Sequence, residues 1–488
     1  MPSIKFPSLP NTQSTYTSLP DSFFQKIKPT PVRDPKLLLW NEELAEEFGL
    51  GSWIDDKFAI AQVFSGNSLP EGLDPFAQAY AGHQFGHFTM LGDGRATMMG
   101  EFNDRNGRLF DFQWKGSGRT KYSRGGDGRA TLGAMLREYL ISESLFYLGI
   151  PTTRSLAVVT TGENVLREEI QTGAVLTRVA SSHIRVGTFE YAYHFSSEQE
   201  ILALLEYSVT RHYPELKQNE NLALSFLEAV MKKQVKLLVH WMRVGFVHGV
   251  MNTDNTSISG ESIDFGPCAF LNGYSSRRVF SSIDQNGRYA FSNQLGIIHW
   301  NLSCLANALL PLIHKDTNKA IEQAKGLLAN FEDWLQESYI QMLGEKIGIP
   351  NLKEKDLPIV QKLFQWMQDH QADFTNTFLV LEGAYHPKEE IYQSPNWKNW
   401  YDEWKREIQL RGISETEAQI LMQKTNPAWI PRNHLLENAL MNAREGSLSL
   451  VNILLQRHKN PYARKLGYDY STELPIGGDA NYQTFCGT

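Results

Sequence analysis

Residues 246–266 combine side chains that could bind a divalent cation with others that could move a proton. An apolar segment, Phe246–Val247, leads into the polar loop 248–255, and residues 256–259 are expected to return as a second strand before Asp264. Amide and carboxylate oxygens are the donors that hard cations prefer. Asn255 and Asp264 are therefore candidate ligands for one Mg²⁺ or Mn²⁺ ion.

The spacing of these two residues is that of a nucleotide site. Kinase-like enzymes hold the metal of ATP with an Asn from one loop and with the Asp of a following Asp-Phe-Gly triplet, which is present at 264–266. Such enzymes also carry an Asp five residues before the Asn, where it accepts the proton of the attacking hydroxyl. Val250 occupies that position. The metal ligands are retained and the usual base is missing, which indicates altered chemistry.

Lys115 and Glu138 are candidates for the contact to the phosphates. Lys115 ends a predicted strand at 110–114, and Glu138 lies in the middle of a predicted helix at 131–148. In kinases a strand lysine binds phosphate and is held by a glutamate from the adjacent helix. A Lys and a Glu taken alone could also be two unrelated surface residues. The placement of Lys115 and Glu138 relative to the loops of Asn255 and Asp264 favours nucleotide binding.

Glycine and arginine motifs add weaker candidates. Gly92, Gly94 and Arg95 form a turn in which backbone N–H groups could approach a phosphate, and Asp127 and Gly128 lie in a similar loop before the 131–148 helix. Both loops are also compatible with ordinary tight turns. Arg178 and Arg185 could clamp phosphates, although paired arginines are common in surface ion pairs.

His83 and His87 have the i, i+4 spacing of a helical metal pair. Flanking glycines argue against a helix, and no third ligand lies nearby in the sequence, so a metal site is disfavoured. A P-loop enzyme is also disfavoured, because the sequence has no Gly-x-x-x-x-Gly-Lys-Ser/Thr motif.

The surrounding elements predict an α+β, protein-kinase-like fold of two lobes. Strands at 96–102, 109–114, 155–160 and 175–179, with one inserted helix at 131–148, predict a β-rich N-lobe. Helices at 222–244, 299–345, 355–380 and 433–457 predict a larger helical C-lobe. A further helix is expected at 35–47. The predicted divisions are an extension wrapping the domain (1–60), the N-lobe (61–197), the C-lobe (198–460) and a tail (461–488).

Composition excludes several classes of protein. The 488 residues carry a net charge of −7 without a dense Lys/Arg run, which argues against a nucleic-acid surface. Three cysteines are too few for a disulfide framework. No apolar run of about 18 residues and no signal sequence are evident, so we expect neither a transmembrane helix nor a membrane partner. A cytoplasmic monomer is expected.

Five ordered motifs resemble those of the selenoprotein O family: GDGRA at 92–96, WKGSG at 114–118, RGGDGR at 124–129, HGVMNTDN at 248–255 and DFGP at 264–267. The resemblance spans residues 79–274, and the helical remainder also suits it. It implies a kinase-like fold that binds its nucleotide turned round. The implied activity is transfer of AMP from ATP to Ser, Thr or Tyr hydroxyls of target proteins with release of pyrophosphate, and UMP transfer is an additional possibility.

The resemblance also implies a role for each candidate residue. Asp254 would be the proton acceptor, which explains Val250, and Glu138 would hold Lys115. Asn255 and Asp264 would hold the metal. The nucleotide would be bound by Gly92, Gly94, Arg95, Lys115, Asp127, Gly128, Arg178 and Arg185, with Glu138 and Asp264 beside it.

Eukaryotic members of that family carry selenocysteine at the third position from the C-terminus, where this chain has Cys486. Whether Cys486 pairs with Cys268, just after the Asp-Phe-Gly-Pro motif, is left open. Cys304 is expected to be a buried, inert thiol.

Two other functions stay open on the sequence. One is a phosphotransferase that uses Asp254 as the base for γ-phosphoryl transfer. The other is an inactive pseudokinase that acts as a scaffold, although retained metal ligands weigh against it. These motifs do not determine the target proteins or the preferred acceptor residue. They also do not determine the preference for ATP or UTP, or for Mg²⁺ or Mn²⁺.

Overall fold

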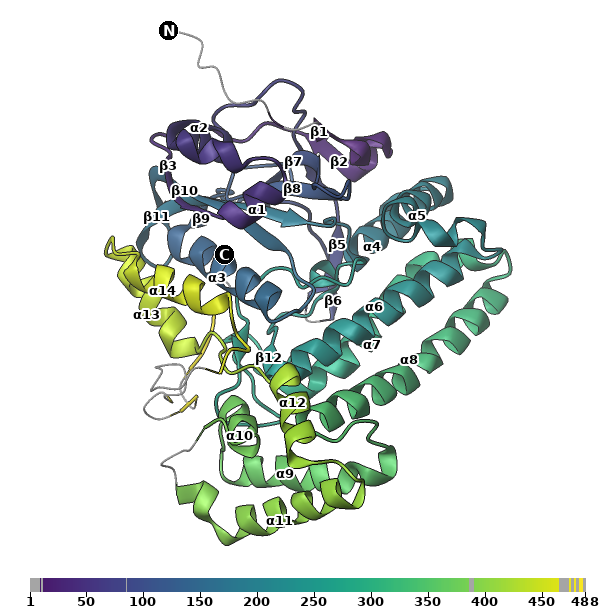
Figure 1. Cartoon of the computed structure of the whole chain (residues 1–488). Helices are drawn as coiled ribbons and strands as arrows, with labels where there is room; N and C mark the ends of the chain where they lie inside the picture. The colour runs from purple at the N-terminus through teal and green to yellow at the C-terminus, as the bar shows by residue number, and fades with distance from the viewer. Residues whose placement is uncertain are drawn as a thin grey trace.

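The protein has a sheet-containing lobe followed by a larger helical lobe (Figure 1). The computed structural model describes residues 9, 12–84, 86–385, 390–464, 474, 478–479 and 482–485. The sheet lies at the top of Figure 1, and the helices extend to the right of it and below it. This arrangement confirms the predicted α+β, kinase-like class.

One antiparallel sheet forms the N-lobe, in the order β2-β4-β7-β8-β11-β10-β3, with β1 beside β7 and β9 beside β11. The predicted hairpin is present as β7 and β8, and the two later strands are longer than predicted. The strands are β1 Thr12–Gln13, β2 Phe24–Lys26, β3 Lys36–Trp40, β4 Phe76–Gln78, β7 Ala96–Asn103, β8 Leu109–Lys115, β9 Ala130–Thr131, β10 Arg154–Leu166 and β11 Ile170–Ala180.

The N-terminal segment differs from its prediction. Residues 36–40 form the edge strand β3 on β10 instead of the first turn of a helix, and the short helix α1, Glu42–Glu47, begins only after them. The Asn41 side chain accepts from Leu44 N and caps α1, which fixes its start. Strands β1 and β2 also join the sheet. Residues 1–60 thus supply part of the sheet.

Apolar side chains alternate between the two faces of the sheet along its strands, and both faces are buried. Met99 and Val159 pack against α1 and α2 (Lys57–Phe64), whereas Met98 and Val158 pack toward α3 (Leu132–Tyr147). Successive strand residues point to opposite faces, so one strand serves two cores. The lobe therefore contains α1 and α2 in addition to the predicted helix α3, which is capped by the Thr131 side chain.

Most predicted long helices are interrupted. The 222–244 prediction is confirmed as α6, which ends at the left-handed Gly245 (φ 73°). The other three stretches each divide in two, because Asp316 and Asp373 cap a second helix and Gly446 (φ 93°) follows α13. The helices are α4 Val186–Phe195, α5 Glu198–His212, α6 Leu222–Val244, α7 Gln294–Ile313, α8 Thr317–Lys346, α9 Leu357–Asp369, α10 Phe374–Leu381, α11 Pro395–Leu410, α12 Glu415–Thr425, α13 Asn433–Arg444 and α14 Ser449–His458.

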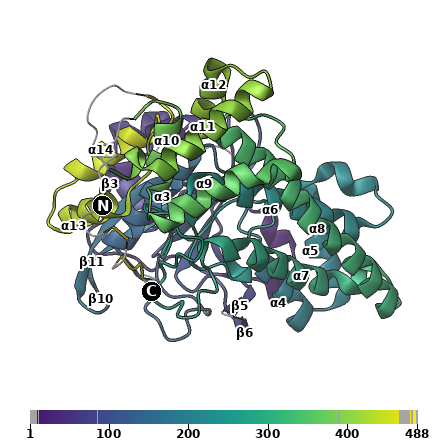
Figure 2. The same ribbon diagram turned by 90° about the horizontal axis from the view of Figure 1, so that it is seen from below.

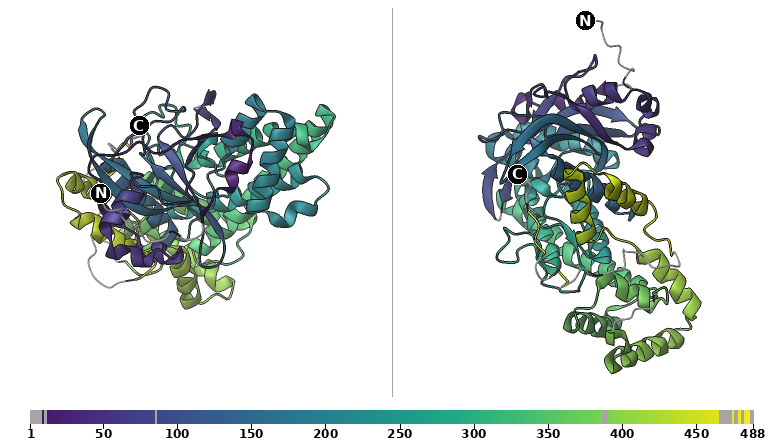
Figure 3. Two further views of the ribbon diagram at one scale, coloured as in Figure 1. Left: turned by 90° about the horizontal axis from the view of Figure 1, so that it is seen from above. Right: turned by 90° about the vertical axis from the view of Figure 1, so that its left-hand side faces the viewer.

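The last helices return to the N-lobe. Helices α13 and α14 contact α3, and both turned views show them alongside the sheet lobe (Figure 3). Helices α9, α11 and α12, with α10 and the end of α8, share a separate apolar core that lies below the sheet lobe in Figure 1 and in front of it in Figure 2, which is seen from below. Helix α3 is therefore held between the sheet and the C-terminal helices.

By length and composition alone, one helical stretch in the described residues, Phe291–Ile313, could span a membrane (23 residues, mean hydropathy 1.4). The sequence predicts no such stretch. Its helix, α7, packs against α4, α6 and α8 in the helical lobe. These contacts are those of a core helix.

Two small two-stranded sheets lie where the lobes meet. Strands β5 (Ala81–Gln84) and β6 (His87–Met90) pair with each other beside α4. Strand β12 (Phe246–Val247) pairs with β13 (Ala269–Phe270), so the prediction that residues 256–259 form its partner strand is wrong. Ser257 instead bridges to Arg185, which draws this segment toward the N-lobe.

Candidate active site

Strand alternation places two cations on the α3 face of the sheet. Trp114 and Val179 face α1 and α2, so their neighbours Lys115 and Arg178 face α3. Strands β8 and β11 are adjacent, with Lys115 opposite Leu176. Both side chains are buried, Arg178 to 2% exposure, so each needs an anionic partner.

Glu138, from the middle of α3, is that partner. Its Oε2 lies 2.6 Å from Lys115 Nζ, and its Oε1 accepts from Arg178 Nε at 2.8 Å. Both neighbouring cations hold the pKa of the Glu138 carboxyl below its usual range in spite of burial. One carboxylate thus fixes both cations at the interface of the lobes.

Asp264 joins this cluster from the other lobe. Its Oδ1 lies 2.5 Å from Lys115 Nζ and 2.5 Å from Arg178 Nη2. Burial opposes ionisation, yet Arg178 and Lys115 hold the pKa of the Asp264 carboxyl well below its usual range. Its backbone has φ 63°, which is uncommon for a residue other than glycine and marks a strained position.

Arg185 links the Asp254 loop to Asp264. Its Nη1 donates to the Asp254 carbonyl at 3.0 Å and lies 3.8 Å from Asp264 Oδ2. Its guanidinium also lies over the Tyr80 ring, 4.3 Å from the centroid. Asp93, which the motif interpretation missed, is buried with Oδ1 4.0 Å from Arg185 Nη2. Burial raises the pKa of Asp93 to about 6.

Asp254 has the environment of a proton acceptor. The side chain is buried, and among the described residues its Oδ1 has no hydrogen-bond partner. Burial raises the pKa of Asp254 to about 6, with Arg185 opposing the rise. A carboxylate with a pKa near 6 is ionised at neutral pH and still basic enough to take a proton. A Cβ on Gly82 of β5 would lie 2.7 Å from Asp254 Oδ1, so this strand lies directly against the carboxylate.

Val250 supplies a backbone contact at the position where kinases carry their base. Asn255 Nδ2 donates to the Val250 carbonyl at 3.0 Å. The amide nitrogen is thereby engaged, and the amide oxygen is the end left to bind a cation. Asp264 Oδ1 is taken up by Lys115 and Arg178, whereas Oδ2 has only the longer, 3.8 Å approach of Arg185 Nη1 and is the oxygen better placed to bind a cation. The oxygen donors of Asn255 and Asp264 therefore fit a hard divalent cation.

The glycine loops are tightly packed turns. A Cβ on Gly92 would lie 2.4 Å from the Tyr122 ring, and one on Gly128 would lie 2.1 Å from the Gly118 carbonyl oxygen. A Cβ on Gly94 would approach the Tyr122 carbonyl to 2.8 Å. Close packing alone therefore accounts for glycine at all three positions.

The polar members of these loops differ in their surroundings. Asp127 binds Arg167 at 2.9 Å and is exposed, so its contacts lie outside the Lys115 cluster. Strand β9 separates this loop from α3, so the loop does not open the helix as the sequence predicts. Arg95 is half-buried just before β7, near enough to Lys115 to lower the pKa of that ammonium, although burial has the larger effect.

Arg137 is a positioning residue that the motifs did not reveal. Its Nε donates to the Gly266 carbonyl at 2.8 Å, and its Nη2 donates to the Cys268 carbonyl at 2.5 Å. It therefore holds the segment after Asp264 against α3. The signal in the sequence was its position next to Glu138. Thr484 Oγ1 donates to the Pro267 carbonyl at 2.7 Å, which places this part of the tail beside the same segment, whereas Cys486 lies outside the described residues.

Residues 8–459 match the sequence model of a family described as protein adenylyltransferase SelO. The chain belongs to this family. Relatives called protein nucleotidyltransferase YdiU are 47% identical over 478 residues in Clostridium perfringens strain ATCC 13124 (98% of both chains), and 48% identical over 479 residues in Brevibacillus brevis (98% of both). The relative from Nitrosococcus oceani is 47% identical over 476 residues (97% of both). The match to the SelO family and these relatives thus show that the protein is a nucleotidyltransferase.

Among solved structures, ROP2 from Toxoplasma gondii, described as a virulence factor with a protein-kinase fold and no enzymatic activity, aligns with 68% of this chain and 87% of its own. The TM-score is 0.24 and the identity is 8%.

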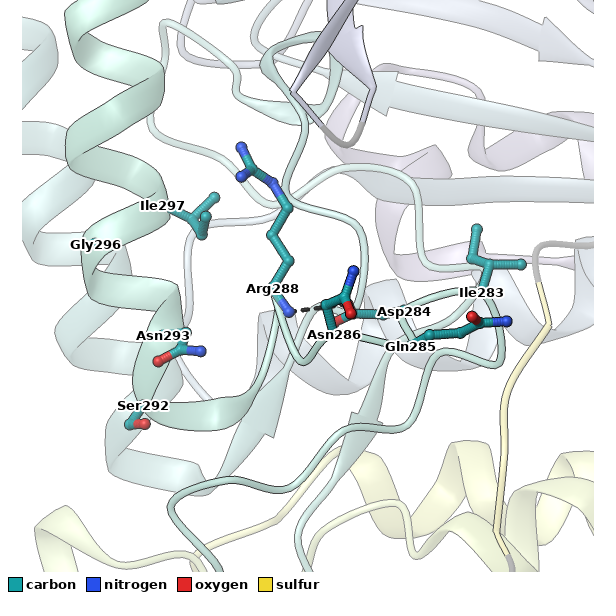
Figure 4. Close-up of a pocket in the computed structure, with 9 residues that line it drawn as sticks. All are labelled: Ile283, Asp284, Gln285, Asn286, Arg288, Ser292, Asn293, Gly296 and Ile297. Atoms are coloured by element: carbon teal, nitrogen blue, oxygen red, sulfur yellow. Dashed lines mark hydrogen bonds between the residues drawn. The ribbon is translucent and has the colours of Figure 1, made fainter.

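A cavity of about 660 Å³ lies beside the start of α7 in this SelO-family protein (Figure 4). It is lined by the segment 283–297, including Asp284, whose carboxylate accepts from Arg288 N at 2.8 Å. The next residue, Tyr289, donates its hydroxyl to Asn252 Oδ1. None of the predicted nucleotide-binding residues lines this cavity.

The close approach of β5 to Asp254 predicts that Gly82→Ala impairs transfer in this SelO-family protein. The added methyl group would displace a carboxylate that now lies 2.7 Å from the Cβ position, and misplacement of about 1 Å can cost ~10²-fold in rate. Initial rates and thermal unfolding should show slower transfer with the fold retained. Gly326→Ala is the matched control, because a Cβ there meets nothing within 4 Å and transfer should stay unchanged. An equal rate loss in both variants would contradict the prediction.

Proposed function

We propose that this protein transfers AMP from ATP to Ser, Thr or Tyr hydroxyls of target proteins and releases pyrophosphate, in the presence of Mg²⁺ or Mn²⁺. The observation that carries the proposal is the buried Asp254 carboxylate, whose Oδ1 is unpartnered among the described residues, while Arg185 holds the backbone carbonyl of the same residue. Membership of a family of protein adenylyltransferases supports the same conclusion.

The proposed step forms one bond and breaks another at the α-phosphorus. The acceptor hydroxyl oxygen bonds to that phosphorus, the bond to the bridging oxygen of the β-phosphate breaks, and pyrophosphate carries away the electron pair. Asp254 Oδ1 takes the hydroxyl proton. Proton removal during attack makes the hydroxyl a stronger nucleophile.

The cations of the site stabilise the charge that develops on the phosphates. Lys115 and Arg178 are held by Glu138, and Arg185 is fixed on the Asp254 carbonyl, so their charges are oriented before the reaction. Preorganised charge of this kind lowers the barrier most where water is excluded. Gly92, Gly94, Arg95, Asp127 and Gly128 remain proposed nucleotide contacts.

Asn255 and Asp264 are the residues that would hold the divalent cation. When bound, such a cation supplies Lewis-acid stabilisation of phosphate oxygens. The chain contributes the Val250 carbonyl, which orients the Asn255 amide, and Arg137, which fixes the segment after Asp264.

Labelled ATP separates the candidate reactions. With the full chain and a protein acceptor such as the enzyme itself, the α-phosphate label should appear on protein and the γ-phosphate label should not. The γ-label on protein would instead show a phosphotransferase that uses Asp254 as base. Neither label on protein would favour a pseudokinase scaffold. α-Labelled UTP in parallel tests UMP transfer.

We also propose that the protein is a cytoplasmic monomer that acts on other proteins and has no nucleic-acid or membrane partner. The net charge of −7 is in line with this proposal. The division at residues 60, 197 and 460 also remains a proposal, with β1, β2 and β3 of the first segment built into the N-lobe sheet.

A further inference from the structure

Three side chains of metal-binding types, from distant parts of the chain, meet beside residues 248–255, which we call the catalytic loop. His83 comes from β5, Glu190 from α4 and Cys304 from α7, and their ligand atoms all lie within 4.8 Å of one another. They line a pocket of about 230 Å³. Figure 2 shows the β5–β6 hairpin beside α4 and α7. His87, the other histidine of the sequence motif, is exposed opposite Gln84 and does not belong to the cluster.

A simple ion pair does not account for this arrangement. His83 Nδ1 lies 2.5 Å from Glu190 Oε1, but Glu190 Oε2 is buried and has no hydrogen-bond partner among the residues described. The Glu190 side chain is only 4% exposed, so water does not readily satisfy that oxygen. Cys304 is half-buried on α7 and faces the pocket, which differs from the buried, inert thiol predicted. The cluster thus has a buried carboxylate oxygen still available, and the Cys304 thiol lies close enough to Glu190 to interact with it.

Imidazole nitrogen, carboxylate oxygen and thiolate sulfur are together the ligand set of Zn²⁺. Zn²⁺ bonds of ~2.0–2.3 Å place tetrahedral ligand atoms roughly 3–4 Å apart, so the three atoms need only small rotations. A neutral imidazole, a carboxylate and a thiolate would neutralise the ion in this partly buried setting, with the Cys304 proton released to solvent. We propose that His83, Glu190 and Cys304 form a Zn²⁺ site whose fourth position opens into the pocket.

The site would be coupled to the catalytic loop through β5. His83 N donates to Thr253 Oγ1 at 2.8 Å, and Gly82 lies against the Asp254 carboxylate. A metal that ties β5 to α4 and α7 would therefore hold the strand against which Asp254 packs. This site is distinct from the Asn255/Asp264 ligands, which offer only oxygen, and does not depend on the proposed transfer reaction.

Cobalt provides the direct test, because a thiolate ligand gives Co²⁺ a charge-transfer absorption that oxygen ligands do not. Metal-free, full-length protein is titrated with Co²⁺ in excess Mg²⁺, which occupies oxygen-only sites. We expect a thiolate–cobalt band that saturates at one equivalent and is abolished when Zn²⁺ is added. Cys304→Ser should remove the band, and Cys268→Ser, which alters a buried thiol elsewhere, should keep it.

Competition with a chelating dye then tests the other ligands. His83→Ala and Glu190→Gln should weaken Zn²⁺ binding by at least ~10–100-fold, the loss produced even by residues that only position metal ligands. His87→Ala is the matched control and should bind Zn²⁺ as wild type does. No band in the wild type, a band that survives Cys304→Ser, or equal losses in His83→Ala and His87→Ala would each overturn the proposal. If Glu190→Gln fails to fold, the His83 and Cys304 variants, at half-buried positions, decide the outcome.

Discussion

Replacing Asp254 with Ala is expected to slow AMP transfer by ~10²–10⁴-fold, the usual contribution of a general base. ATP binding should be retained, because Arg185 contacts the backbone carbonyl of residue 254 at 3.0 Å and Ala keeps that carbonyl. The fold should also persist, since the lost Oδ1 makes no hydrogen bond to any described residue. Single-turnover rates at saturating ATP, together with nucleotide titration, measure the two effects separately.

Asp93→Asn is the informative companion to Asp254→Ala. Asp93 is a second buried carboxylate near Arg185, and burial raises its pKa to about 6 as well. If Asp254 is the base, Asp93→Asn should slow transfer far less than Asp254→Ala. Near-wild-type transfer by Asp254→Ala, with a large loss in Asp93→Asn, would move the base to Asp93.

Asp264→Ala is expected to abolish transfer and to remove the effect of Mg²⁺ on ATP binding. The substitution deletes a hard oxygen ligand and leaves Glu138 as the anionic partner of both Lys115 and Arg178 among the described residues. Loss of a single stabilising group at a developing anion costs ~10²–10³-fold, and the loss of the metal as well should exceed that. Titration of a fluorescent ATP analogue with and without Mg²⁺ reports the binding effect.

Two controls accompany Asp264→Ala. Asp264→Asn keeps the size of the side chain and should restore folding if the alanine variant is unstable, without restoring transfer. Asp74→Ala removes an exposed carboxylate paired with Lys26, a surface ion pair of small energetic value, and should leave transfer unchanged. Full activity in Asp264→Ala would rule out the metal assignment.

The sequence by itself determined the elements that carry local signals. The hairpin of β7 and β8 and the helix α6 follow their apolar periodicity, and α6 ends where Gly245 adopts a left-handed conformation. The order of Lys115, Glu138, Asn255 and Asp264 likewise indicated a kinase-like site. Period-2 alternation places Lys115 on the face opposite Trp114 once the strand is recognised.

Other parts of the fold depended on partners distant in the sequence. Residues 36–40 are apolar enough for either a helix or a strand, and pairing with β10 decided for the strand. Residues 256–259 have the composition of a strand, but β12 pairs with β13, which follows the Asp-Phe-Gly triplet. Such choices are made by hydrogen-bond partners that a local pattern does not contain.

Only the tertiary structure decided which side chains meet. It placed Arg178 on Glu138 together with Lys115, and it placed Arg185 between Asp254 and Asp264. It also separated His83 from His87 and joined His83 to Glu190 and Cys304, 107 residues away in the case of Glu190. The motifs fix the types of side chain available. The protonation and metal affinity of these side chains depend on their burial and on their charged partners. Both are set by packing between elements far apart in the chain.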